Sequence, residues 1–370
     1  MKITNLYAYF GFLGIYQIDS PGHTFYQLGL IDSLKEEFGG DNFDFYSYYP
    51  EKIKNEHHEE FFIPNDEIGH VFSNYFQKLM NVYNISLENT LEKIRVKQYG
   101  KIFLKARFRN LSTLSKKWDD TLQFEKILEE ACKTYSREDI IILDTDLSLP
   151  ETFIAKYASK VTILTPSLDF PGISSSFLDD CVKVNLHKFE TNKKKKGIIY
   201  YGNIDTSNYK SSNSKSSILI DALRDLAKTQ YADSFCPINI VGKKDTPLDS
   251  IIGATDLKLI DRSDRESIWK ALNENLVMLN ISKDKYAEVG FIPARIYEAM
   301  IFGMIPVSYR FSFLNKAFSF KNIDELSEII KYLDETSSQD WAIAYSSFIN
   351  SYKKHEISLN EKRKNNTSMP

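Results

Sequence analysis

Residues 290–307 read GFIPARIYEAMIFGMIPV, and this stretch indicates the fold class of the chain. Proline suits the first turn of a helix, so a helix is expected from Pro293 to residue 302. Gly303 follows it, and the short apolar run at residues 305–308 has the length of a strand. A helix that leads through a glycine into a buried strand is typical of parallel α/β sheets.

The same alternation of short apolar runs and helical patterns continues on both sides of this stretch. Strands are predicted at residues 198–201, 238–241, 257–260 and 276–281, and helices at 214–229, 267–275, 323–333 and 340–353. We therefore expect a C-terminal Rossmann-like domain over residues 191–354. The polar, lysine-rich residues 355–370 are expected to form a flexible tail.

The N-terminal half carries the same pattern in a less regular form. Strands are predicted at residues 3–12, 43–49, 140–144 and 161–165, and helices at 23–38, 124–135 and 150–159. Residues 55–117 do not follow the alternation, and we expect an elaboration there. The predicted fold is α/β, with a first Rossmann-like domain at residues 1–190 and a lysine run at 193–196 as the linker.

Length and composition exclude several classes of protein. The 370 residues suffice for two domains with separate cores, and a net charge of −3 argues against general attraction to polyanions. No apolar run approaches the roughly 20 residues of a membrane helix, and the first 17 residues lack a small-residue cleavage site. The three cysteines are far apart and have no histidine at metal-ligand spacing. We expect a cytoplasmic monomer without a membrane segment or a structural metal.

Ligands of a doubly wound sheet bind beyond the carboxyl ends of its strands, so the residues that follow the C-terminal strands are candidates. They include a glycine and a helix start that could hold a phosphate, and a loop that could contact a nucleobase. The candidates are Gly202, Asn203, Lys215, Gly242, Asp261 and Arg262. Each also has a plainer interpretation, since glycines make turns and charged loop residues face solvent.

Arg295 and Glu298 lie three residues apart and would share one face at the start of the predicted helix. An arginine there can bind a diphosphate with two hydrogen bonds, assisted by the helix dipole, and a glutamate can accept from ribose hydroxyls. The alternative is an ordinary surface ion pair worth about 0.2–0.5 kcal/mol.

Two of these segments resemble glycosyltransferases of the GT-B fold, in particular the DNA β-glucosyltransferase family of T-even bacteriophages. The strand, Tyr-Gly-Gly and polar loop of that family resemble Tyr201, Gly202 and Asn203 with the strand before them. Its Arg-x-x-Glu-x-Met helix is matched by Arg295 and Glu298. The resemblance implies two Rossmann-like domains that face each other across a central cleft, with a C-terminal helix crossing back to the N-terminal domain.

The resemblance also implies an activity and a division of roles. Arg295 would bind the diphosphate of a nucleotide-sugar donor, expected to be a UDP-sugar, and Glu298 its ribose. The acceptor would be a hydroxymethylated base in duplex phage DNA, in the host cytoplasm if the chain is phage-encoded. No tightly bound cofactor or metal is expected, although a divalent cation could stimulate the reaction. A saccharide acceptor and a non-catalytic nucleotide- or DNA-binding protein are the alternatives.

The family takes its catalytic base from the loop after a strand of the N-terminal domain. The corresponding loop here, residues 165–171, carries Asp169, and Asp19 is a second candidate. His23, Asp144 and Asp146 are rivals. The last two form an Asp-x-Asp sequence that binds a metal in the other glycosyltransferase fold, but it lies in the half without the donor motifs. The stereochemistry of transfer stays open.

A basic stretch in the N-terminal half suggests how a nucleic acid could be held. Residues 93–117 contain nine lysines and arginines and no acidic residue. Phosphate contacts are expected from Lys97, Lys101, Lys105, Arg107 and Arg109. Stacking on bases is expected from Tyr99, Phe103 and Phe108. The alternative is a solvated basic segment whose aromatic side chains belong to the core.

Overall fold

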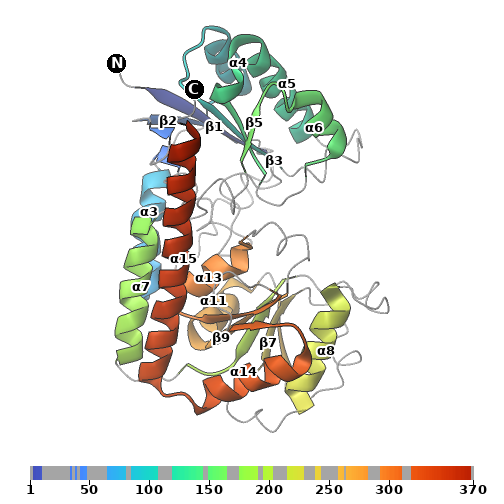
Figure 1. Ribbon diagram of the computed structural model, residues 1–370. Coiled ribbons are helices and arrows are strands. Elements are labelled where there is room, and N and C mark those ends of the chain that lie inside the picture. The colour runs from blue at the N-terminus through green and yellow to red at the C-terminus, as the bar shows by residue number, and fades with distance from the viewer. Residues whose placement is uncertain are drawn as a thin grey trace. The chain divides into compact units, whose positions relative to one another are not determined.

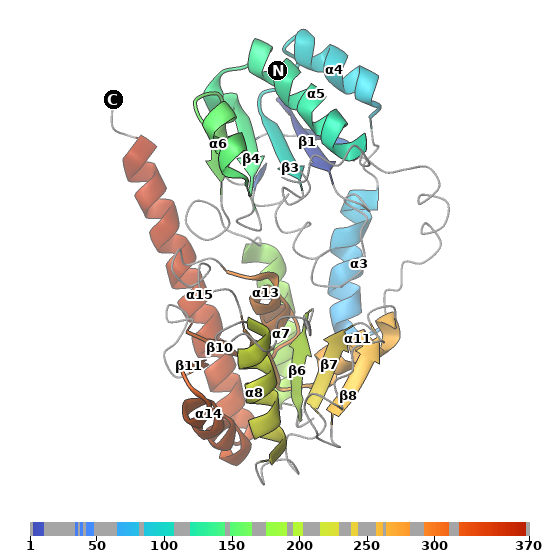
Figure 2. The ribbon, with the colours of Figure 1, turned by 90° about the vertical axis from the view of Figure 1, so that its right-hand side faces the viewer.

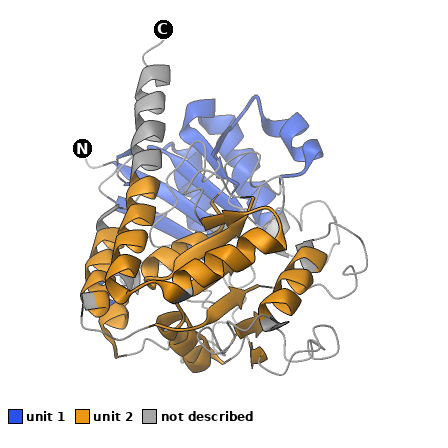
Figure 3. Cartoon of the chain, turned by 60° about the horizontal axis from the view of Figure 1, so that its bottom comes forward, with its two compact units in different colours: residues 1–18, 23–61, 73–174 blue, residues 19–22, 62–72, 175–370 orange. Residues whose placement is uncertain are grey.

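The structure is a computed structural model. The residues that it describes are 3–10, 34–35, 38–39, 42–47, 65–80, 85–106, 119–144, 149–164, 175–190, 195–202, 215–228, 238–242, 257–261, 264–281, 292–310 and 318–367. The chain divides into two compact units, coloured separately in Figure 3. Unit 1 comprises residues 1–18, 23–61 and 73–174, and unit 2 comprises residues 19–22, 62–72 and 175–370.

Unit 1 contains a five-stranded parallel sheet with the order β2-β1-β3-β4-β5 (Figure 1). Its strands are β1 (Thr4–Phe10), β2 (Asn42–Ser47), β3 (Ile102–Ala106), β4 (Ile140–Leu143) and β5 (Thr162–Leu164). The middle strand, β3, lies within residues 55–117, where the sequence suggested an elaboration. The sequence pattern hid it because Lys105 interrupts the apolar run while its side chain is buried.

Helices cover one face of this sheet and form the core of unit 1 with it. They are α4 (Leu87–Arg95), α5 (Asp119–Thr134) and α6 (Glu151–Tyr157). The helix α5 packs on β1, β3 and α4. Phe124 of α5 and Phe153 of α6 lie with their ring centroids 6.1 Å apart in this core. The burial of such apolar surface is the main source of stability for the unit.

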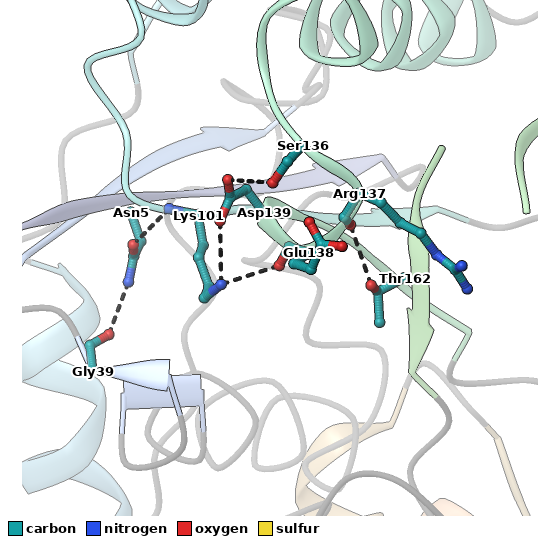
Figure 4. A network of polar contacts seen from close by, with 8 residues as sticks. All are labelled: Asn5, Gly39, Lys101, Ser136, Arg137, Glu138, Asp139 and Thr162. Atoms are coloured by element: carbon teal, nitrogen blue, oxygen red, sulfur yellow. Dashed lines mark hydrogen bonds and ion pairs between the residues drawn. The ribbon is translucent and has the colours of Figure 1, made fainter. Parts of the chain in front are cut away.

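Polar side chains tie together the segments that enter the strands at the amino edge of this sheet (Figure 4). The Asn5 side chain accepts from the Lys101 backbone N–H at 2.9 Å and donates to the Gly39 carbonyl at 2.9 Å. The Lys101 ammonium lies 3.4 Å from an Asp139 oxygen, and Asp139 accepts from Ser136 at 2.7 Å. These contacts join the starts of β1, β3 and β4, so this edge serves the fold.

Unit 2 contains a six-stranded parallel sheet with the order β11-β10-β9-β6-β7-β8. Its strands are β6 (Ile198–Tyr201), β7 (Ile238–Gly242), β8 (Leu257–Asp261), β9 (Val277–Asn280), β10 (Ile305–Tyr309) and β11 (Ser319–Phe320). The carboxyl ends of β6 and β9 lie side by side in the middle, where the order of the strands reverses direction. Such a switch point is where open parallel sheets bind ligands.

Helices lie on both faces of the second sheet. They are α7 (Ser175–Glu190), α8 (Lys215–Lys228), α11 (Arg265–Glu274), α13 (Ala294–Ile301), α14 (Ile323–Glu335) and α15 (Ser338–Thr367). The helices α8 and α14 pack together, and α13 packs on β9 and β10 with α7 against it (Figures 1 and 2). The helix α15 packs along α7.

Two helices depart from the sequence-based expectation. The helix α7 begins the C-terminal part of unit 2 at residue 175, earlier than the predicted boundary at residue 190. Its apolar face is interrupted by the buried Asn185. The helix α15 continues to Thr367, through residues that were expected to form a flexible tail. Residues 360–367 of this helix, NEKRKNNT, are all polar, a composition that carries no amphipathic signal.

A segment from the N-terminal half packs in unit 2. Asp66 precedes α3 (Glu67–Met80) and accepts from the Gly69 backbone N–H at 2.6 Å. Its other carboxylate oxygen accepts from the indole N–H of Trp269 in α11 at 2.7 Å. The Phe72 and Trp269 rings lie 6.4 Å apart. Residues 62–72 therefore belong to unit 2 although they precede most of unit 1 in sequence.

The two parallel-sheet units confirm the predicted α/β fold class. Within the described part of the chain, no helix combines the length and apolar character needed to cross a membrane.

Candidate functional site

The helix α13 carries both residues of the Arg-x-x-Glu motif. It begins after Pro293, whose φ of −70° suits a helix start, and it ends before Gly303, whose φ is +64°. The Ile296 and Met300 side chains are fully buried and bind the helix to the sheet. Arg295 lies in the first turn and is half-buried.

The guanidinium of Arg295 lies at the carboxyl edge of the second sheet. Its Nε donates to the Tyr201 carbonyl at the end of β6. Its Nη1 donates to the Ile281 carbonyl beyond β9 at 3.3 Å and lies 3.5 Å from Oδ1 of Asn280. The guanidinium carbon also stands 5.0 Å from the centroid of the buried Tyr200 ring. Two neighbouring strands thus hold the arginine at the switch point.

Gly202 makes room for this arrangement. A Cβ atom there would lie against Nη2 of Arg295, so the guanidinium would have to shift. The φ of Gly202 is +154°, a backbone conformation that side-chain-bearing residues rarely adopt. The structure thereby brings together two residues that the sequence singled out separately.

The electrostatic setting of Arg295 favours an anion. Within the described part of the chain its partners are two carbonyls, an amide oxygen and an aromatic ring, and no carboxylate pairs with it. A guanidinium has five N–H donors, and these acceptors do not use them all. A half-buried arginine whose described partners are all neutral is suited to bind a phosphate.

Glu298 lies one turn further along α13 and is only 2% exposed. Its burial removes the alternative of an ordinary surface pair with Arg295, and no ion pair joins the two side chains in the described part of the chain. A buried carboxylate is costly unless hydrogen-bond donors satisfy it. The sequence-based expectation that Glu298 accepts from ribose hydroxyls stays a prediction.

Other candidates from the sequence line the same edge. Gly242 and Asp261 end the neighbouring strands β7 and β8 and are paired in register. The Gly202 N–H donates to the Val241 carbonyl at 3.3 Å, which joins the end of β6 to β7. Lys215 begins α8, and its side chain lies outside the described set. Asn203 and Arg262 also lie outside the described residues.

The structure describes one of the candidates for the catalytic base. Asp144 follows β4, is 5% exposed, and accepts from the Leu149 backbone N–H at 3.3 Å. This bond joins the end of β4 to the residues just before α6, which gives Asp144 a structural role. Asp169, Asp19, His23 and Asp146 lie outside the described residues.

The basic stretch of unit 1 differs from the sequence-based interpretation. Tyr99 and Phe103 are buried, so neither ring is available to stack on a base. The ammonium of Lys101 lies near Asp139, and the side chain of Lys105 is buried. Lys97 is exposed. Arg107, Phe108 and Arg109 lie outside the described residues.

Sequence reasoning missed two contributors to the arginine site. Asn280 and Tyr200 are both fully buried, and each lies within an otherwise apolar strand. The available signal was the polar last residue of the strand VMLN, since a buried amide at a strand end needs a partner. Among the described residues, no group of three potential metal ligands comes together.

One solved structure has a fold that agrees with this architecture. No family model and no curated protein matches the sequence. The fold is similar to that of the DNA-modifying enzyme β-glucosyltransferase, determined with and without uridine diphosphoglucose, at 13% identity. The match covers 98% of this chain and 99% of that one, with a TM-score of 0.53. A UDP-forming α,α-trehalose-phosphate synthase from Burkholderia vietnamiensis matches at 9% identity, covering 97% and 95% of the two chains, with a TM-score of 0.42.

Proposed function

We propose, from the GT-B fold that the first of these likenesses establishes, that this chain transfers a sugar from a UDP-sugar to an acceptor hydroxyl. The observation that supports the proposal most strongly is the guanidinium of Arg295 at the sheet's switch point, where all of its described partners are neutral. That position suits the diphosphate of a nucleotide-sugar, as the Arg-x-x-Glu motif suggested.

The roles follow from the chemistry of the transfer. The bond between the sugar and the diphosphate breaks, the new bond forms to the acceptor oxygen, and the acceptor loses a proton to a base. Arg295 would stabilise the charge that develops on the departing UDP. Glu298 would accept from the ribose, while Gly242, Asp261 and Arg262 would lie near the nucleobase and Asn203 and Lys215 near the phosphates. Asp169 is the proposed base, with Asp19 second.

For the acceptor we propose a hydroxymethylated base in duplex DNA, held by unit 1. The support is the fold shared with a DNA-modifying β-glucosyltransferase and the basic character of residues 93–117. The buried rings of Tyr99 and Phe103 weaken the stacking part of that argument. A saccharide acceptor is the second candidate, since unit 2 would serve it equally. We place the protein in the cytoplasm as a monomer, without a tightly bound cofactor and with a divalent cation at most as a stimulant.

The test combines a panel of UDP-sugars with duplex DNA that contains 5-hydroxymethylcytosine. The DNA is digested and its bases are weighed by mass spectrometry. We expect a sugar-mass increment with the wild type, and its loss in Arg295→Ala and Asp169→Asn. Arg224→Ala is the matched control, because that arginine lies in α8 and is paired with Asp221.

Two other outcomes have defined meanings. Slow hydrolysis of the UDP-sugar without a DNA increment would retain the transferase and direct the search to saccharide acceptors. Absence of both UDP binding and donor turnover would contradict the proposed activity.

A further inference from the structure

The C-terminal end of α13, opposite to Arg295, is held by side chains from three separate segments of unit 2. The Asn185 amide in α7 donates to the Ile301 carbonyl at 2.8 Å. The Tyr345 hydroxyl in α15 donates to the Met300 carbonyl, and the Lys195 ammonium before β6 donates to the Phe302 carbonyl. We call Asn185, Lys195 and Tyr345 the capping cluster.

These carbonyls are the ones that a helix end leaves without backbone partners. The last backbone bonds of α13 run from the Phe302 N–H to Glu298 and from the Met304 N–H to Ala299. The next three carbonyls along the chain therefore take one side-chain donor each from the capping cluster. Water often fills this role at an exposed helix end, whereas here three side chains of fixed position do so.

The side chains of the capping cluster are buried and closely packed around the end of α13. Asn185 and Tyr345 are at most 1% exposed, and Lys195 is 9% exposed. A Cβ atom on Gly303 would lie 2.6 Å from Cγ of Asn185, so the backbone after α13 passes directly against that amide. The cap thus permits little sliding of the helix along its axis.

When it is protonated, Lys195 adds to this restraint through its charge. A cation at the C-terminal end of a helix interacts favourably with the helix dipole. In the described part of the chain Lys195 donates to the Phe302 carbonyl and has no carboxylate partner. Burying an ammonium in this way is costly, so the contact with the end of α13 accounts for its position.

The length of α13 connects the capping cluster to the site. Its eight residues extend over about 12 Å, so the helix is short and moves as a rigid body. An axial shift at the capped end would carry Arg295 away from the carbonyls of Tyr201 and Ile281.

We propose that Asn185, Lys195 and Tyr345 are positioning residues of the donor site, because they set the axial position of α13 and so hold Arg295 at the strand ends. This inference rests on the proposed function. It makes the donor site dependent on α7 and α15, two helices with no residue among the described contacts of Arg295.

The test compares Tyr345→Phe, Asn185→Leu and Lys195→Met with two controls at exposed positions, Tyr332→Phe and Lys196→Met. Calorimetry with UDP and steady-state kinetics give the affinity and both Michaelis constants. We expect the Kd for UDP and the KM for the UDP-sugar to rise about tenfold in the capping variants, which corresponds to about 1.4 kcal/mol. The KM for the acceptor should stay at the wild-type value.

Hydrogen exchange of residues 296–304, measured without ligand, provides an independent reading. We expect faster exchange in the capping variants and wild-type exchange in both controls. Lys195→Gln keeps a neutral donor and should recover part of the UDP affinity that Lys195→Met loses. Tyr345→Phe keeps the ring and so remains informative if Asn185→Leu does not fold.

The two proposals fail in different ways. Folded capping variants with wild-type UDP affinity and wild-type exchange in α13 would overturn the positioning role alone. A wild-type chain that binds neither UDP nor a UDP-sugar would overturn the proposed function together with this role.

Discussion

Arg295 is the residue of unit 2 that we propose binds the diphosphate of the donor. Charge-assisted hydrogen bonds contribute about 1.5–3 kcal/mol each, so Arg295→Ala is expected to weaken UDP binding by about 10- to 100-fold. Arg295→Lys keeps the charge but loses the planar fork, and should recover only part of that affinity. Isothermal calorimetry measures both variants. Equal affinity in Arg295→Ala and the control Arg224→Ala would remove Arg295 from the site.

A second prediction at the scale of one residue concerns Gly202 and the stability of the protein. Gly202→Ala places a methyl group against the guanidinium of Arg295 and forces the backbone into an unfavourable conformation, at a cost of about 1–3 kcal/mol. Urea unfolding should show this loss. Gly242→Ala is the matched control for stability, because its methyl group would meet Leu259 at an ordinary 3.6 Å. A Gly202→Ala protein as stable as Gly242→Ala would contradict the close contact.

At the scale of an element, the capped end of α13 links the stability of unit 2 to pH. Burial, reinforced by Lys188, lowers the pKa of Lys195 to about 7, whereas the pKa of an unfolded lysine is about 10.4. Between these values the unfolded chain binds more protons than the folded chain, so this group makes the free energy of unfolding rise with pH. Below about pH 7 both states are protonated and the rise stops.

Lys195→Met should abolish that rise. Urea unfolding measures the free energy of unfolding of both proteins between about pH 7 and about pH 10. The difference between wild type and variant is expected to rise by up to about 1.4 kcal/mol per pH unit. The exposed neighbour provides the control, since Lys196→Met should follow the wild type. Parallel pH profiles for Lys195→Met and the wild type would mean that Lys195 titrates normally.

The elements also show how far sequence reasoning reaches. Strands β4 and β6 are uninterrupted apolar runs, and β9 is apolar up to its last residue, Asn280. All three were predicted within a residue or two. The strand β3 was missed because it contains the buried Lys105, and α7 because the buried Asn185 interrupts its apolar face. Arg295 and Gly202 were found by motif and position. Asn280 was not, since its role depends on a neighbouring strand that the sequence does not show to be adjacent.

At the scale of the whole molecule, the contact between Asp66 and Trp269 joins residues 203 positions apart in sequence. For this hydrogen bond to a charged group, we expect a coupling energy of about 1.5–3 kcal/mol between Asp66→Ala and Trp269→Phe. A double-mutant cycle measured by urea unfolding isolates this energy from the role of Asp66 at the start of α3. Additive effects of the two substitutions would show that the contact does not stabilise unit 2.

The same contact affects the order in which the protein is completed during synthesis. Asp66 leaves the ribosome 203 residues before the indole that it binds, a delay of roughly 10–40 s at 5–20 residues per second. The remainder of unit 1, residues 73–174, is translated within that interval. The nascent chain must therefore keep the segment around Asp66 out of the first sheet while that sheet assembles, and unit 2 is finished by docking a segment made long before it.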